Sequence, residues 1–75
     1  MTTQEHLQRI RAKCVERILE HEAYSITHGY KVGQDACAGW RATIAAIDSI
    51  STMEGGAAKH FLERDILAAW PEELL

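Results

Sequence analysis

The chain has 75 residues, of which 47% are hydrophobic and 25% are charged, and its net charge is −3 at pH 7. These proportions are those of an ordinary folded domain, and they exclude a disordered or collagen-like chain. We expect a single domain over residues 1–75, whose small core has little margin of stability unless a disulfide, a metal or a second chain adds to it.

The first predicted helix covers about residues 3–28. Thr2 and Glu5 fit the capping box that opens many helices. Apolar and weakly polar residues then recur at steps of three and four and form one stripe: Leu7, Ile10, Cys14, Ile18 and His21. Charged residues of opposite sign lie three or four positions apart on the other side, which is typical of a solvated helix face.

A second apolar strip runs beside this stripe and has three members: Val15, Leu19 and Ile26. Arg11 and Glu22 interrupt it. The helix is expected to end at Gly29, within the glycine-containing linker HGYKVGQ. Because Tyr24 and Tyr30 lie on either side of this glycine, we expect them to form an exposed aromatic contact with a partner.

The second predicted helix covers about residues 35–54, with Asp35 as its N-terminal cap. At 3.6 residues per turn it has two different apolar faces. The bulky face consists of Cys37, Trp40, Ile44 and Ile47. The small face consists of Gly39, Ala42, Ala46 and Ser49, with Ile50 and Met53 near its C-terminal end. Because small side chains let another backbone approach closely, this helix is expected to be central and buried on both sides.

The third predicted helix covers about residues 57–70, between the pair Gly55-Gly56 and Pro71. Its expected inner stripe, with two aromatic residues at the margins, comprises Ala58, Leu62, Ile66 and Ala69, then Phe61 and Trp70. Leu67 falls outside this stripe. The C-terminal PEELL is too short to fold alone, so it is expected either to dock on the helices or to fray.

Three apolar-faced helices predict an all-α fold. The fold is either a small three-helix bundle or a helical hairpin plus a short third helix, and dimerisation is one way to complete its core. Apolar side chains left outside such a core commonly mark an interface. The residues expected to bind a partner are Val15, Leu19, Tyr24, Ile26, Tyr30, Leu67 and Trp70.

Candidate chemical groups are few. Cys14, His21 and His28 lie on one line of the first helix, but steps of seven separate them by about 10.5 Å, too far for one metal ion. No nucleophile motif, phosphate loop or paired acidic constellation is present. The polar N-terminus and the lack of a long apolar run predict a cytoplasmic protein with reduced, buried Cys14 and Cys37. We expect no catalytic residue, cofactor or metal, and no enzyme activity.

The favoured interpretation is a small non-enzymatic protein-binding module that modulates or inhibits a larger protein partner of unknown identity, alone or as a homodimer. By analogy only, its size is similar to that of the short accessory proteins of bacteria and their phages. The alternative is a helix-turn-helix-like DNA-binding regulator that uses Lys59, His60 and Arg64 of the third helix. Residues 32–75 hold three Lys or Arg against seven Asp or Glu, so counterion release would drive nucleic-acid binding only weakly.

Overall fold

The computed structural model describes the backbone of residues 2–29 and 34–75, and the side chains of these residues except 34–36. In these parts of the chain, three α-helices and a short 3₁₀ helix follow in the order α1 (Thr3–His28), α2 (Gln34–Ser51), α3 (Ala57–Ala69) and η1 (Glu72–Leu74), without any strand. The predicted all-α class is therefore confirmed. The expectations for Tyr30 and for the capping side chain of Asp35 lie outside the described residues.

Capping interactions fix both ends of α1 where the sequence places them. The Oγ1 atom of Thr2 accepts a hydrogen bond from the backbone N–H of Glu5 at 3.1 Å. At the other end, Gly29 adopts the left-handed conformation with φ 71°, and its N–H donates to the carbonyl oxygen of Ser25. Residues 3–28 are helical as predicted, since both ends are determined by local groups.

The second helix is shorter than predicted and ends at Ser51. In its last turn, the backbone N–H groups of Thr52 and Met53 donate to carbonyl oxygens three residues back. The hydroxyl groups of Ser51 and Thr52 also donate to carbonyls three residues back, and such bonds compete with the α-helical pattern. The helix therefore ends before Gly55 and Gly56, whose positive φ angles of 118° and 99° carry the chain into α3.

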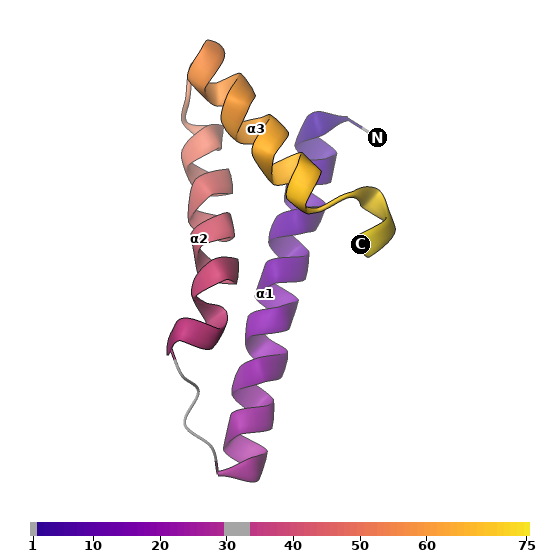
Figure 1. The fold of residues 1–75 in the computed structure, drawn as a ribbon, viewed down its shortest axis with the longest axis vertical. Helices are drawn as coiled ribbons and strands as arrows, with labels where there is room; N and C mark the ends of the chain where they lie inside the picture. The colour runs from indigo at the N-terminus through magenta and orange to yellow at the C-terminus, as the bar shows by residue number, and fades with distance from the viewer. Residues whose placement is uncertain (1, 30–33) are drawn as a thin grey trace.

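The helices form a hairpin with one short helix laid across it. α1 and α2 run antiparallel, and α3 crosses the N-terminal half of α1, as Figure 1 shows. The chain measures 46 × 22 × 16 Å, because the 26 residues of α1 span about 39 Å whereas the 13 residues of α3 span about 20 Å. The end of the hairpin near Gly29 therefore extends beyond α3.

The core lies where the three helices meet. Its buried members are Leu7, Ile10, Cys14, Ile47, Ile50 and Ile66. Partly buried residues packed against them are Trp40, Ile44, Ala46, Leu67, Trp70 and Leu75. Cys37 is also fully buried. These positions confirm Leu7, Ile10 and Cys14 of the predicted stripe of α1, and they confirm the bulky face of α2, whereas Ile18 and His21 are only partly buried. At the C-terminus Leu75 packs against the core and Leu74 is exposed.

The prediction that α2 is buried on both sides is wrong for most of its small face. Gly39, Ala42 and Ser49 are exposed, and no heavy atom lies within 4 Å of the position that a Cβ atom on Gly39 would take. Ala46 and Ile50 do pack in the core. The third helix therefore meets only part of this face, since Ser49 is exposed even though it lies in the last turn of α2, just before the connection to α3.

The prediction of which side of α3 faces the core is also wrong, because the helix is rotated by part of a turn from the predicted orientation. Three of the four residues assigned to it are exposed: Ala58, Leu62 and Ala69. Leu67, expected outside, packs against the core together with Trp70. Turning α3 this way buries larger side chains than alanine and so removes more apolar area from water. The Nε2–H of His6 donates to the carbonyl oxygen of Trp70 at 2.9 Å and ties the end of α3 to α1.

Candidate protein-binding surfaces

Three side chains on one side of α1 form a surface that we call the aliphatic face: Val15, Leu19 and Ile26. Their steps of four and seven residues place them within about 40° of one another around the helix axis. Leu19 is 59% exposed and Ile26 is 83% exposed, whereas Val15 is half-buried. The packing of α2 and α3 thus leaves two large aliphatic side chains of this face in contact with water.

Two ion pairs join α1 to α2 beside the aliphatic face. Arg11 donates from Nε and Nη2 to the two carboxylate oxygens of Asp48, at 2.8 and 3.3 Å. The Nη2 of Arg41 donates to the Oε1 of Glu22 at 3.2 Å. The hydrogen bond from Arg11 is the main reason why the pKa of Asp48 is lower than its ordinary value. Because these charges are already paired, a partner that covers the aliphatic face need not supply counter-charges for them.

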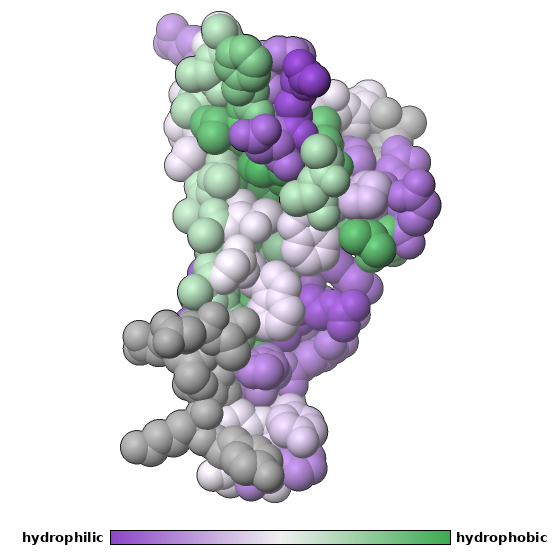
Figure 2. Space-filling model, viewed as in Figure 1, coloured by the Kyte–Doolittle hydropathy of each residue, from purple (hydrophilic) through white to green (hydrophobic). Residues whose placement is uncertain are grey.

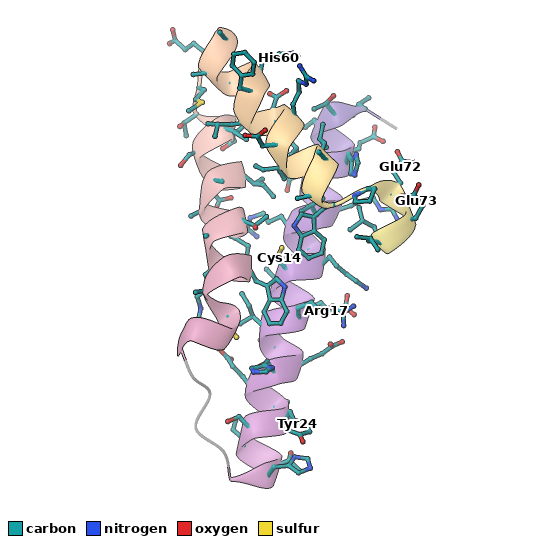
Figure 3. All side chains as sticks on the ribbon, viewed as in Figure 1. Cys14, Arg17, Tyr24, His60, Glu72 and Glu73 are labelled. Carbon is teal, nitrogen blue, oxygen red and sulfur yellow. The ribbon has the colours of Figure 1, made fainter. Side chains whose placement is uncertain are left out.

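A second surface, which we call the aromatic hollow, lies between α1 and α2 on the part of the hairpin beyond α3. It is open to solvent, encloses about 330 Å³ and is lined by Arg17, Glu20, His21, Tyr24 and Trp40. The rings of His21 and Trp40 meet edge to face with centroids 6.0 Å apart. Arg17 and Glu20 form an ion pair at 3.6 Å. Figure 3 shows Arg17 and Tyr24 on the stretch of α1 that α3 leaves uncovered.

Tyr24 belongs to the aromatic hollow and not to the aliphatic face. It comes nine residues after Val15, or two and a half turns, so the two side chains point to opposite sides of the helix. Its ring stacks on that of His28 with centroids 4.0 Å apart, and 56% of the residue is exposed. The structure therefore divides the predicted partner-binding residues of α1 between two sides of the helix, with Leu19 and Ile26 on one side and Tyr24 on the other.

The partner-binding residues predicted near the C-terminus lie elsewhere. Leu67 and Trp70 are partly buried against the core. Among the exposed apolar side chains of α3, Phe61 is 60% exposed and Leu62 is 36% exposed, and Phe61 was expected only at the margin of the buried stripe. Phe61 and Trp70 are nine residues apart, so they point in opposite directions from the helix. That spacing was the signal in the sequence that could have identified Phe61.

The described side chains show no arrangement suited to metal or thiol chemistry. Within the described residues, no three His, Cys, Asp or Glu side chains are placed to hold a metal ion. Cys14 and Cys37 are free and buried, and burial raises the pKa of the Cys14 thiol. Because the thiolate is the reactive form, a buried thiol with a raised pKa is a poor nucleophile.

Comparisons with known proteins do not assign the chain to a family. No family model, curated protein or solved structure matches it. Of the helices in the described parts of the chain, none combines the length and the apolar character needed to cross a membrane. The functional interpretation therefore depends on the aliphatic face and the aromatic hollow.

Proposed function

We propose that this chain is a small non-enzymatic module that binds a larger protein in the cytoplasm and thereby modulates or inhibits it. The observation that carries the proposal is the exposure of Leu19 and Ile26 on one side of a helix. Burying a Leu or Ile side chain contributes about 1.5 to 3 kcal/mol. A folded chain this small gains that free energy only when another surface covers the aliphatic face.

The surroundings of the aliphatic face support a protein partner over a small molecule. The face lies along a helix, beside ion pairs that already neutralise Arg11 and Glu22. Small molecules are usually bound in enclosed clefts that cover most of their surface, whereas an exposed helix side suits the apolar stripe of another helix or a flat protein surface. The partner's contact surface is therefore expected to be apolar and of low charge.

Affinity capture with mass spectrometry tests this function. The immobilised chain is compared with the double variant Leu19→Lys/Ile26→Lys, and Thr27→Lys is the matched control because Thr27 is exposed but about 100° away from Ile26 around the helix. A protein retained by the wild type and by Thr27→Lys, but lost from the double variant, supports the proposal. Retention of the same proteins by all three chains contradicts it.

The DNA-binding alternative has weaker support from the arrangement of α3. The Nζ of Lys59 lies 3.5 Å from the carbonyl oxygen of Met53, so this cation is directed toward its own chain. Arg64 is exposed but lies next to Asp65 on the same helix. A duplex-DNA mobility shift whose affinity falls steeply with salt would reverse this ranking.

A further inference from the structure

We propose that a second copy of this chain packs face to face with the first, so that Phe61 of each copy enters the aromatic hollow of the other. The aromatic hollow lies on a different side of α1 from the aliphatic face. The two proposals therefore use separate surfaces, and each can fail without the other.

The aromatic hollow is on the same side of α1 as α3. His6, which holds the end of α3, and Tyr24, which lines the hollow, are 18 residues apart, or about five helical turns. The side of the hairpin that faces α3 in the N-terminal half of α1 thus faces solvent in the C-terminal half. Because α3 is half as long as α1, a second α3 helix supplied by another copy has room to lie over the open half.

Phe61 is placed to act as the anchor of this contact. It points away from the core, because it lies half a turn from Trp70, which packs inward. It is therefore on the outer surface of the layer formed by α3, where Figure 2 shows hydrophobic and hydrophilic residues side by side on the face seen there. A protruding aromatic side chain set against a recess lined by Trp40 and Tyr24 is typical of the buried centre of an interface.

The charges next to the two surfaces are complementary. Arg64 and Asp65 are exposed close to Phe61 on α3, and Arg17 and Glu20 line the aromatic hollow. Each surface thus carries one cation and one anion. Glu20 pairs with Arg17 in the single chain at 3.6 Å, and in the dimer Arg64 of the other copy joins this pair on the side of Glu20, which sets the direction in which the two surfaces meet.

The exposed area of the chain is consistent with an interface of ordinary size. The chain exposes 5255 Å², whereas a compact protein of 8.4 kDa exposes about 4,600 Å². This excess reflects the elongated shape of the chain. A contact that covered about 650 Å² of each copy would bury about 1,300 Å² in the pair, within the range of stable protein interfaces.

A single two-fold axis makes both contacts at once. Figure 3 labels His60, the neighbour of Phe61, near one end of the molecule, and it labels Tyr24 of the aromatic hollow near the other end. Both surfaces lie on the side of the hairpin that carries α3. The axis lies in the plane of the interface, perpendicular to the long dimension of the molecule. It rotates the second copy end for end and places its α3 side against the α3 side of the first copy. The contacts are then identical and the assembly closes as a dimer.

Light scattering or sedimentation equilibrium over about 1 µM to about 1 mM tests the dimer. The expected mass at high concentration is twice the 8.4 kDa of one chain. Phe61→Glu should raise the dissociation constant about 30-fold or more, as expected for loss of an interface anchor. Because Phe61 is exposed in the single chain, this variant should keep its helical circular-dichroism spectrum.

Exchange of charges tests the direction of the contact. Glu20→Arg and Arg64→Glu should each weaken the dimer, and the double variant should recover most of the affinity because the pair is restored in reverse. Ile26→Lys is the control on the other side of α1, and it should leave the dissociation constant unchanged. Two results would overturn the proposal: a monomer throughout the concentration range, or a dimer that survives Phe61→Glu.

Discussion

At the scale of single residues, the exposed ion pair between Arg11 and Asp48 gives a contribution to stability that acid removes. The pKa of Asp48 is lowered in the folded chain, mainly by the hydrogen bond from Arg11. As the pH falls, Asp48 is therefore protonated in the unfolded chain at a higher pH than in the folded chain. The ion pair stabilises the fold fully above the ordinary pKa of Asp, and this stabilisation is lost as the pH falls to the lower pKa of Asp48 in the folded chain.

We expect Asp48→Asn to reduce the pH dependence of the unfolding free energy below about pH 4. Urea denaturation followed by circular dichroism at several pH values measures this dependence. Glu16→Gln is the control, because the ion pair that Glu16 forms in the described residues is with Lys13 of the same helix, at 3.8 Å. Identical acid profiles for the wild type and Asp48→Asn would show that the ion pair contributes nothing measurable.

The core contains so few residues that truncating one of its side chains should lower the unfolding free energy of the whole chain. Ile10 is fully buried where the three helices meet. Ile10→Ala should cost about 2 to 5 kcal/mol through lost apolar burial and the cavity that remains. Leu19→Ala is the matched control, since Leu19 is exposed and its truncation should cost less than about 0.5 kcal/mol. Similar urea midpoints for the two variants would contradict the assignment of the core.

At the scale of helices, two glycines should respond to alanine in opposite ways. Gly29 ends α1 with φ 71°, so Gly29→Ala should destabilise the chain by about 1 to 2 kcal/mol. Gly39 lies inside α2 with open space where a Cβ atom would go, so Gly39→Ala should stabilise it by about 0.5 to 1 kcal/mol. Thermal melts of both variants measure the contrast, and a lower melting temperature for Gly39→Ala would indicate close packing on the small face after all.

The bounds of α1 could be predicted because capping residues act on their own neighbours, whereas α2 ends three residues earlier than predicted. Thr2 and Gly29 fix α1 without help from the rest of the chain. Which faces are buried depends instead on how far one helix reaches over another. The exposure of Gly39 and Ala42 follows from the short length of α3, and helical periodicity within α2 carries no information about that length.

The candidate surfaces also differ in whether the sequence alone could predict them. The exposure of Leu19 and Ile26 on the aliphatic face could be predicted, because α1 has a separate apolar stripe that is sufficient to pack against a neighbouring helix. The aromatic hollow could not, because it exists only where α3 stops short of the end of the hairpin. Phe61 was missed because α3 has apolar residues on several sides and its inward side is chosen by packing against α1 and α2.

At the scale of the whole molecule, the fold is elongated and the core shared by all three helices lies toward one end, although Ser25 and Cys37 are also buried toward the other. The radius of gyration is 14.0 Å, whereas a compact chain of this length has a value of about 11 Å. Every buried residue of the core cluster on α1 lies between Leu7 and Cys14. Of the elements in the described residues, α1 and α2 alone reach the end near Gly29, so opening that end exposes less apolar surface than opening the core.

We therefore expect amide hydrogens of residues 20–28 to exchange faster than those of residues 7–17, although both segments belong to one helix. Hydrogen exchange followed by NMR at low protein concentration measures this gradient. If a second copy covers the aromatic hollow, protection around Tyr24 should rise with concentration in the wild type but not in Phe61→Glu, because only the wild type brings a second α3 over that end. Uniform protection along α1 at every concentration would instead mean that the helix opens only with global unfolding, and that the exposed end is as stable as the core.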